Sequence, residues 1–235
     1  MKEGHIMKIE IWSDYACPFC YIGEKRLDKA LAEVNAGDKV EIEFKSFELD
    51  PTASNEVESE TIERFALKYG MSREEAANRV EQISMMGRRE EIDFKYATTR
   101  YTNTFESLRL TKLAQERGHN EIIIKLFDAY FTKNFELSNH DVLKNIAAVC
   151  EIDPADVDEV LNGDKYSEEV RTDEHEAAKL GIHGVPYFVI GGKYGLSGAQ
   201  PVHVLKEAIE SVLDEEAVAE LDGMTCGSNG CKFEG

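Results

Sequence analysis

Two cysteines near the N-terminus are spaced for reversible sulfur chemistry. The segment Cys17-Pro-Phe-Cys20 is a Cys-x-x-Cys motif with a proline directly after the first cysteine. Two thiols at this spacing can exchange with a disulfide or supply half of the ligands of a zinc ion. A zinc site needs two further ligands, usually another Cys or His pair, and none follows at the usual distance. The spacing therefore favours dithiol–disulfide exchange, and no metal site is expected.

The residues around the motif predict a strand before it and a helix after it. Residues 8–11 alternate charged and apolar side chains, which indicates a strand, and an apolar stripe at helical spacing follows at Leu27, Leu31 and Val34. This order places Cys17 at a helix N-terminus, where free backbone N–H groups and the helix dipole stabilise a thiolate. Pro18 suits the first helical turn. Cys20, one turn further in, is expected to be more buried and to attack a mixed disulfide formed on Cys17.

Composition and charge narrow the class of protein. The chain has 235 residues, with 46 acidic and 27 basic side chains and a formal net charge of −19. This charge disfavours nucleic acids and anionic membranes as partners. No apolar run approaches the roughly 18 residues of a membrane span, and residues 1–7 lack the apolar core of a signal peptide. We therefore expect a cytoplasmic protein, in which a reactive cysteine pair is usually catalytic.

The remaining pattern predicts an α/β fold, namely a thioredoxin-like mixed four-stranded sheet with a large all-helical insertion. Residues 7–50 predict strand–helix–strand, and residues 184–213 predict two strands, joined at Gly191-Gly192, and a helix. Together they would form a discontinuous thioredoxin-like domain. Residues 60–183 predict a helical insertion domain with its own core, with helix starts at Ser72, Ser138 and Asp153. Residues 214–235 predict an acidic, flexible C-terminal tail that contains two cysteines.

Six stretches in order carry a resemblance to a known family. They are Trp12-Ser-Asp-x-x-Cys17-Pro-Phe-Cys20-Tyr-Ile-Gly23, Phe47-Glu-Leu-Asp-Pro51, Asn103-Thr104, Leu126-Phe-x-Ala-Tyr-Phe131, Gly181-Ile-x-Gly-Val-Pro186-x-Phe-Val-Ile190 and Ser197-Gly-Ala-Gln200. With them the sequence resembles the DsbA-type thiol:disulfide oxidoreductases of the thioredoxin superfamily, most closely the FrnE-like subgroup, over residues 7 to about 213. It departs from that subgroup at Phe19, where Trp is usual, and at Ser107, where His is common.

The resemblance implies a role for each residue of the site. Cys17 and Cys20 would be the catalytic dithiol, and Val185-Pro186 the cis-proline loop, whose backbone pairs with a substrate cysteine. From sequence alone, a trans proline that opens an edge strand is the default for Pro186. Substrate-binding residues would therefore be Val185, Pro186, Pro18 and Phe19.

The same resemblance sets expectations for partners and direction. No cofactor beyond the redox-active disulfide is expected, and glutathione is one candidate thiol partner. Substrates would be proteins or small molecules with a thiol or disulfide, recycled by a separate thiol reductant or oxidant. The apolar pair Pro18-Phe19 lacks the polar group that stabilises the thiolate in strongly oxidising relatives. It therefore predicts a milder potential, suited to a reductase or isomerase.

Several other side chains are candidates for a functional or structural role. Cys226 and Cys231 form a second pair, either incidental thiols or an accessory redox pair that exchanges electrons with Cys17 and Cys20. Asp14 either caps its loop or assists proton transfer from Cys20. Cys150, on an apolar helical stripe, is expected to be a buried core thiol, and His183 an exposed histidine.

Two other functions stay open at this point. The kappa-class glutathione transferases and hydroxychromene-carboxylate isomerases resemble this chain in layout, but they carry a single Ser or Cys and bind glutathione without dithiol chemistry. The presence of both Cys17 and Cys20 argues against them. A non-catalytic binding protein on the same scaffold would show no disulfide exchange at all.

Overall fold

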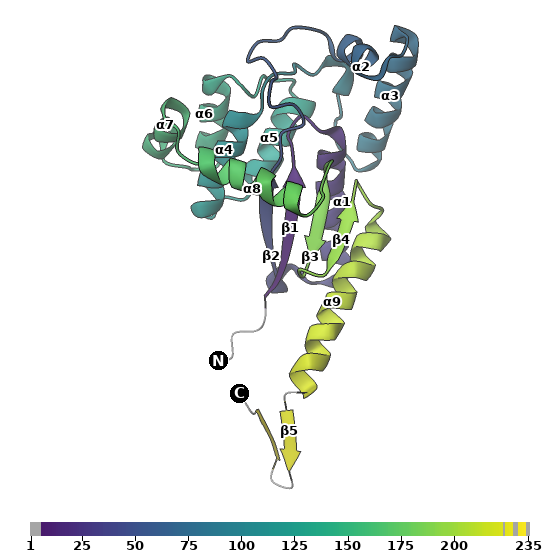
Figure 1. Cartoon of the computed structure of the whole chain (residues 1–235), viewed down its shortest axis with the longest axis vertical. Coiled ribbons are helices and arrows are strands. Elements are labelled where there is room, and N and C mark those ends of the chain that lie inside the picture. The colour runs from purple at the N-terminus through teal and green to yellow at the C-terminus, as the bar shows by residue number, and fades with distance from the viewer. Residues whose placement is uncertain (1–5, 223, 228–229, 234–235) are drawn as a thin grey trace.

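A four-stranded mixed sheet forms the centre of the molecule (Figure 1). The computed structural model describes residues 6–222, 224–227 and 230–233. Strand β1 (Met7–Ser13) pairs in parallel with β2 (Val40–Ser46) and antiparallel with β3 (Tyr187–Ile190), which pairs with β4 (Tyr194–Ser197). The strand order is β2-β1-β3-β4. The predicted fold class is confirmed, and the turn at Gly191-Gly192 joins β3 to β4 with both glycines at positive φ, the conformation that glycine adopts most easily.

Helices α1 (Pro18–Val34) and α9 (Val202–Asp222) pack against each other and against the sheet, with the short 3-10 helix η1 (Gly37–Lys39) between α1 and β2. The predicted apolar faces of both helices are buried. They meet the apolar side chains of β1 and β3 in one core cluster, whose members include Ile9, Ile11, Leu27, Leu31, Phe188, Ile190, Leu205, Ile209 and Val212. This cluster holds α1, and with it the cysteine motif, in a fixed position on the sheet.

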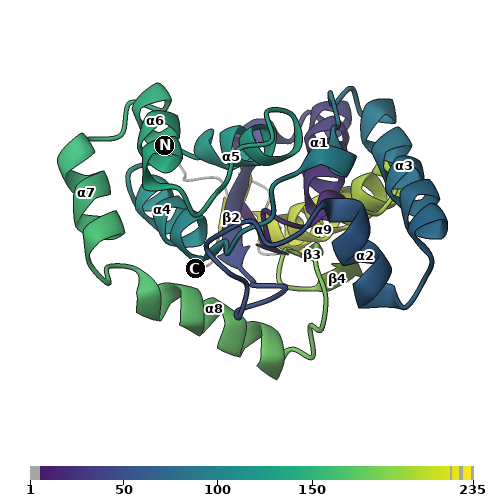
Figure 2. The same ribbon diagram turned by 90° about the horizontal axis from the view of Figure 1, so that it is seen from above.

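The segment between β2 and β3 is helical throughout. It contains α2 (Thr61–Tyr69), α3 (Arg73–Arg89), the 3-10 helix η2 (Tyr96–Thr98), α4 (Phe105–Glu116), α5 (Ile122–Phe131), α6 (His140–Val149), α7 (Pro154–Asn162) and α8 (Ser167–Lys179). Seen from above, α8 lies on one side of the sheet and α1 on the other (Figure 2).

Three helix starts were predicted in this segment, and two are confirmed. Ser72 forms a capping box with Glu75, and Asp153 accepts a hydrogen bond from the Ala155 N–H. The third helix starts one residue later than predicted, because the side chain of Asn139 accepts from the N–H groups of residues 141 and 142. Ser138 instead uses its hydroxyl to bond the Asn55 carbonyl. Its side chain is therefore not available as the cap.

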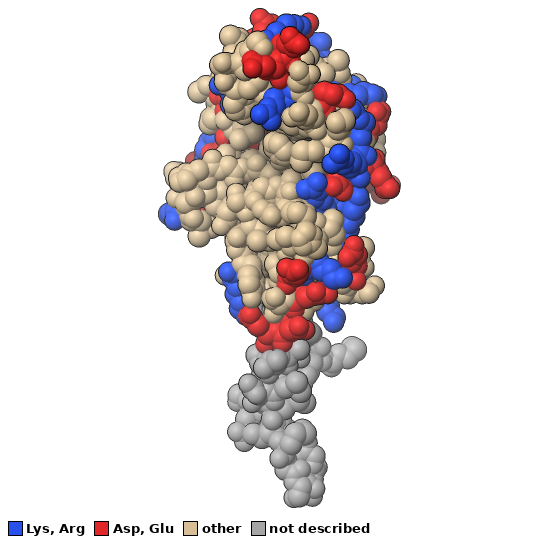
Figure 3. Space-filling view, turned by 90° about the vertical axis from the view of Figure 1, so that its right-hand side faces the viewer, with Lys and Arg blue, Asp and Glu red and all other residues tan. Residues whose placement is uncertain are grey.

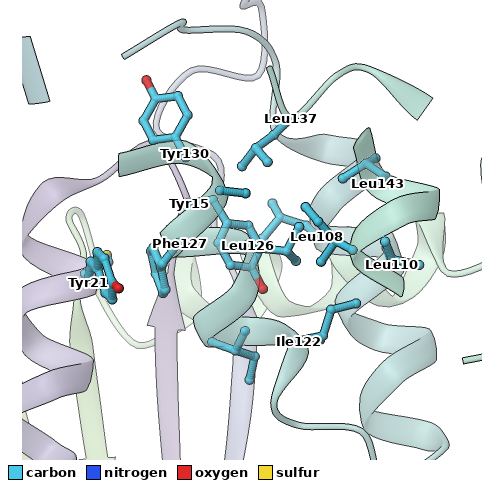
Figure 4. Close-up of a cluster of buried hydrophobic side chains, with 14 of the residues drawn as sticks. Tyr15, Tyr21, Leu108, Leu110, Ile122, Leu126, Phe127, Tyr130, Leu137 and Leu143 are labelled. Atoms are coloured by element: carbon cyan, nitrogen blue, oxygen red, sulfur yellow. The ribbon is translucent and has the colours of Figure 1, made fainter. Parts of the chain in front are cut away.

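The core of these helices is not separate from the sheet, as a helical domain with its own core would require. One cluster joins Phe127 of α5 to Tyr15, Tyr21 and Phe44, which belong to the strand–helix–strand unit (Figure 4). Tyr21 stacks on Phe127 with ring centroids 5.2 Å apart, and Tyr15 meets Phe127 edge-on at 4.9 Å. Cys17 and Cys20 belong to the same cluster. The helices therefore supply one wall of the surroundings of the cysteine motif.

A buried carboxylate ties α8 to the sheet on the other side. Asp173 forms ion pairs with Lys45 of β2 and Lys112 of α4, and it accepts the Ser46 N–H at 2.7 Å. Its backbone carbonyl accepts the indole N–H of Trp12 at 2.9 Å. These contacts fix the end of β1 that leads into the cysteine motif.

The C-terminal segment differs from the predicted flexible tail. Helix α9 continues to Asp222, and β5 (Met224–Gly227) and β6 (Gly230–Phe233) form a two-stranded antiparallel sheet. Residues 214–222 are mostly Glu, Ala, Leu and Asp, and the first three favour helix continuation. In the backbone register Cys226 lies directly opposite Cys231.

Candidate active site

Cys17 lies at the N-terminus of α1, as predicted. It is the N-cap residue in extended conformation, and Pro18 occupies the first helical position. The Cys17 N–H donates to the Asp14 carbonyl at 3.0 Å, and the Cys20 N–H donates to the Cys17 carbonyl at 3.1 Å. The Cys17 sulfur therefore lies where unpaired helix N–H groups and the helix dipole favour a negative charge.

Both sulfurs are buried, Cys20 slightly more than Cys17. The exposed fraction is 4% for Cys17 and 2% for Cys20. Burial, followed by the neighbouring Cys17, raises the pKa of Cys20 well above its ordinary value, while the Ser13 hydroxyl and the Asp14 backbone partly oppose this rise. Pro18 is buried and Phe19 half-buried. Of the two intervening residues, Phe19 therefore offers the larger surface to a substrate.

The loop before β3 lies against the reactive sulfur. The Val185-Pro186 peptide bond is cis. The Cys17 thiol donates a hydrogen bond to the Val185 carbonyl at 3.4 Å, across 168 residues of sequence. Pro186 is buried and its carbonyl accepts the Gly198 N–H at 2.7 Å, which ties the loop to the end of β4.

Close packing of α1 against this loop fixes the distance between the cysteine motif and the Val185-Pro186 peptide. Gly23, one turn after Cys20, has no side chain, and a Cβ at this position would lie 3.1 Å from both Pro186 and Phe188. Arg26, on the next turn, donates to the Ala199 carbonyl at 2.7 Å and pairs with Glu90, the residue directly after α3. The glycine of the Tyr-Ile-Gly23 motif is thus needed for a close helix–loop approach.

Asp14 organises the loop that leads into the motif. One carboxylate oxygen accepts the Ala16 N–H at 3.0 Å, and the other accepts the Leu49 N–H at 2.7 Å. The side chain is buried, and burial raises its pKa. Because both oxygens are occupied by backbone donors, the structure favours the loop-capping alternative over proton transfer from Cys20. The bond to Leu49 also explains why Phe47-Glu-Leu-Asp-Pro51 accompanies the cysteine motif.

The other predicted residues lie away from this centre. Cys150 is buried at the C-terminal end of α6, as expected, and its pKa is raised by burial. His183 is exposed, two residues before Val185. The side chains of Cys226 and Cys231 lie outside the described residues. No group of three or more His, Cys, Asp or Glu side chains within the part of the chain that the structure describes is arranged to hold a metal ion.

Ser13 is a site residue that the sequence alone did not point to. Its hydroxyl lies beside the Cys20 sulfur and lowers the pKa of that thiol. The only sequence signal is its position at the end of β1, directly before Asp14. Ser107, the departure from the usual family pattern, has a structural role, since its buried hydroxyl donates to the Thr104 carbonyl at 2.7 Å.

A dithiol at a helix N-terminus, beside a cis-proline loop on a mixed four-stranded sheet, defines the class of thiol:disulfide oxidoreductases. A comparison with known families agrees. Residues 8–210 match the model of the DSBA-like thioredoxin domain. This protein therefore belongs to the DSBA-like thioredoxin domain family.

Individual relatives support the same assignment. The uncharacterized protein YwbO of Bacillus subtilis strain 168 is 28% identical over 204 residues, which cover 86% of this chain and 94% of YwbO. The crystal structure of a probable DsbA oxidoreductase, SCO1869 from Streptomyces coelicolor, is 36% identical with a TM-score of 0.84, over 97% of this chain and all of that one.

A 2-hydroxychromene-2-carboxylate isomerase shares the fold alone. Its TM-score is 0.65 at 14% identity, over 91% of this chain and 99% of that one. The fold by itself therefore does not separate the oxidoreductases from this isomerase. Within the residues described, no helix has the length and apolar character needed to cross a membrane.

Proposed function

We propose that this protein reduces or isomerises disulfides through the dithiol Cys17 and Cys20. The observation that carries the proposal is the position of the Cys17 sulfur, at the N-terminus of α1 and 3.4 Å from the Val185 carbonyl. A nucleophilic sulfur is thereby placed beside a backbone group that can pair with the backbone of an incoming cysteine. The motifs shared with the FrnE-like subgroup support placing the protein there.

The exchange proceeds in two steps. The Cys17 thiolate attacks one sulfur of the substrate disulfide, so that the substrate S–S bond breaks, a Cys17–substrate S–S bond forms, and the other substrate sulfur leaves as a thiolate that takes up a proton. Cys20 then loses its proton and attacks the Cys17 sulfur. This closes the Cys17–Cys20 disulfide and releases the second substrate sulfur. The substrate gains two electrons, the enzyme dithiol loses two, and an external thiol restores the dithiol.

The surroundings of the motif support the reducing direction. Pro18 and Phe19 offer no polar group to the sulfurs, and burial keeps Cys20 protonated at neutral pH. A thiol pool in the cytoplasm, where we place the activity, would keep the pair reduced between turnovers.

The surface supports substrates as large as proteins. Although the chain is strongly acidic, the face shown in Figure 3 has a broad uncharged stretch, bordered by charged side chains at the top, along the right-hand side and at the lower edge. Exposed apolar side chains occur on α2 and α3, at Leu67, Tyr69 and Met85. An uncharged surface suits an unfolded polypeptide that presents a cysteine.

We further propose that Cys226 and Cys231 form an accessory dithiol that passes electrons to Cys17 and Cys20. Residues directly opposite each other in an antiparallel pair have Cα atoms about 4.5–5.5 Å apart, a separation that a disulfide can bridge. In Figure 1, β5 follows the end of α9 that lies farthest from the four-stranded sheet. Transfer between two molecules therefore needs less rearrangement than transfer within one chain. Activity per molecule that rises with protein concentration, and does so only with both cysteines present, would support this step.

Dithiothreitol-driven reduction of insulin tests the main proposal. Wild type and Cys150→Ala should both accelerate insulin precipitation, since Cys150 is a buried thiol outside the site, whereas Cys17→Ser should not. A wild-type protein without activity, under conditions in which thioredoxin turns over, would sink the proposal. Equal activity in Cys17→Ser would do the same.

A further inference from the structure

Among the residues that the structure describes, one half-buried arginine lacks a carboxylate partner. Four arginines in the described residues are half-buried or buried, and three of them, Arg26, Arg109 and Arg171, each form an ion pair with a glutamate. The fourth, Arg64 of α2, forms none within the described residues. In a chain with 46 acidic side chains, a half-buried arginine without a carboxylate partner among the described residues is unexpected. Its environment therefore points to a ligand.

The side chains around Arg64 hold its guanidinium in place but do not neutralise its positive charge. Its guanidinium lies over the ring of Tyr101, 3.6 Å from the ring centroid. Stacking on an aromatic face leaves the N–H groups at the guanidinium edge free to donate. The carboxylates that act on Tyr101 are already bound by backbone donors: Asp14 accepts the Leu49 N–H, and Asp50 accepts the Thr52 N–H.

A buried tyrosine hydroxyl that makes no well-formed hydrogen bond to the described residues lies beside this arginine. The Tyr130 side chain is only 1% exposed, and its hydroxyl has no hydrogen-bond partner of good geometry in the described part of the chain. It lies near Arg64 and Thr99, and Figure 4 shows it pointing away from the other labelled side chains of the cluster. A buried hydroxyl left unpaired costs free energy, so a position of this kind is usually filled by a partner.

The tyrosine hydroxyls near Arg64 are neutral hydrogen-bond donors and not phenolate anions. Burial raises the pKa of Tyr96, Tyr101 and Tyr130 above the ordinary value, so each keeps its proton at neutral pH. A neutral hydroxyl next to a guanidinium can donate to an oxygen anion that the guanidinium attracts. The set therefore suits a carboxylate.

This arrangement lies close to the reactive cysteine. Tyr96 of η2 lies within electrostatic reach of both Cys17 and Arg64. It also belongs to the same apolar cluster as Cys17, and Phe65, the neighbour of Arg64 in α2, packs against that cluster together with Phe19 and Val185. A molecule whose sulfur is at Cys17 can thus extend toward α2.

We propose that Arg64, with the Tyr130 hydroxyl as a second donor, binds a carboxylate of a small thiol or disulfide whose sulfur reacts at Cys17. The inference rests on the proposed function, because it names the substrate class of that same site. The carboxylate would accept from the guanidinium edge and from the phenol, and the Tyr101 ring would hold the guanidinium in place. Arg64 would then discriminate anionic small disulfides from neutral ones.

Binding of S-methylglutathione, which carries two carboxylates and no free thiol, tests the inference without requiring turnover. Calorimetric titration should show binding to wild type and about tenfold weaker binding to Arg64→Met, the loss expected for one charge-assisted contact. Arg79→Met is the matched control, because Arg79 is an exposed arginine of α3 without a carboxylate partner. Its affinity should equal that of wild type. Equal affinity in wild type and Arg64→Met, or no binding to wild type, would overturn the inference.

Kinetics separate this inference from the proposed function. Arg64→Met should raise the KM for glutathione disulfide about tenfold and leave reduction of the neutral bis(2-hydroxyethyl) disulfide unchanged. An equal loss with both disulfides would show that Arg64 supports the fold or the cysteines and not the carboxylate. If wild type reduces no disulfide but the titration still depends on Arg64, the proposed function fails and the carboxylate site stands.

Discussion

The chain contains two cysteine pairs that are built in different ways. Cys17 and Cys20 lie at the start of a buried helix, and the Cys17 thiol is bonded to a carbonyl 168 residues away. Cys226 and Cys231 face each other across a hairpin whose pairing is local. The fold surrounds the first pair with buried side chains, a helix N-terminus and the Val185-Pro186 loop. For the second pair, the backbone register places the two cysteines opposite each other. Reactivity at the first pair is therefore a property of the whole domain.

Complementary variants should show the largest difference between the pairs. A chain that retains only Cys17 and Cys20, with the other three cysteines replaced by serine, should keep at least about half of the wild-type rate of insulin reduction. A chain that retains only Cys226 and Cys231 should fall below about 1% of that rate, because these cysteines lie in the strands β5 and β6 and not at a helix N-terminus. Comparable rates in the two variants would show that Cys17 and Cys20 are no more reactive than Cys226 and Cys231.

Replacing Asp14 tests whether activity requires the Asp14 carboxylate to hold the loop that leads into Cys17 and Cys20. In Asp14→Asn the amide can accept only one of the two backbone N–H groups, so one buried donor loses its partner. We expect the free energy of unfolding to fall by about 2 kcal/mol and the rate of disulfide reduction to fall about tenfold. Asp50→Asn, in an exposed loop, is the control. An unchanged rate in Asp14→Asn would show that the loop needs no such support.

Gly23 tests the contact between the helix and the loop of the first pair. A Cβ at this position would meet Pro186 and Phe188 at 3.1 Å, so Gly23→Ala should lower the free energy of unfolding by about 1 kcal/mol and the activity a few-fold. At Gly37 a Cβ would meet nothing within 4 Å. Gly37→Ala should therefore leave the rate unchanged. Denaturant titration and the insulin assay measure both effects, and equal behaviour of the two variants would contradict the close approach.

The smallest expected effect is on the pH dependence of stability, and it comes from Glu24, an ionisable group near Cys17 and Cys20. Burial raises the pKa of the half-buried Glu24, one turn after Cys20, to about 8, with a smaller contribution from Asp28. The unfolded chain releases this proton near pH 4.5 and the folded chain near pH 8, so the folded state loses stability as pH rises through this interval.

Glu24→Gln should remove that dependence. Because Glu24 is partly exposed to solvent, which weakens the effect, the variant should gain about 1 kcal/mol over wild type as pH rises from 5 to 8, measured by denaturant titration at each pH. Glu33→Gln, an exposed position on the same helix, should show no such gain. Parallel stability curves for wild type and Glu24→Gln would show that Glu24 keeps its ordinary pKa.

The fold and the cysteine centre were largely predictable, because their signals are local. Alternating residues fix the strands, and the spacing of Cys17, Pro18 and Leu27 fixes the helix start. The contacts of Asp14 with Leu49 and the lack of a partner for Arg64 depend on the packing of distant segments, which no local pattern encodes. The full length of α9 was not predicted, because the acidic stretch Asp214-Glu-Glu216 and the glycines around Cys226 and Cys231 are typical of a tail, although residues 214–222 also include helix-forming Glu, Ala and Leu.

Trapping of the mixed disulfide shows whether Cys17 is the sulfur that attacks the substrate. Cys20→Ser, incubated with a substrate disulfide and digested, should yield a peptide in which Cys17 is joined to the substrate, because nothing remains to resolve the intermediate. Wild type under the same conditions should yield a peptide with the Cys17–Cys20 disulfide. Substrate joined to Cys150, Cys226 or Cys231 with Cys17 free, or no adduct at all, would contradict the account.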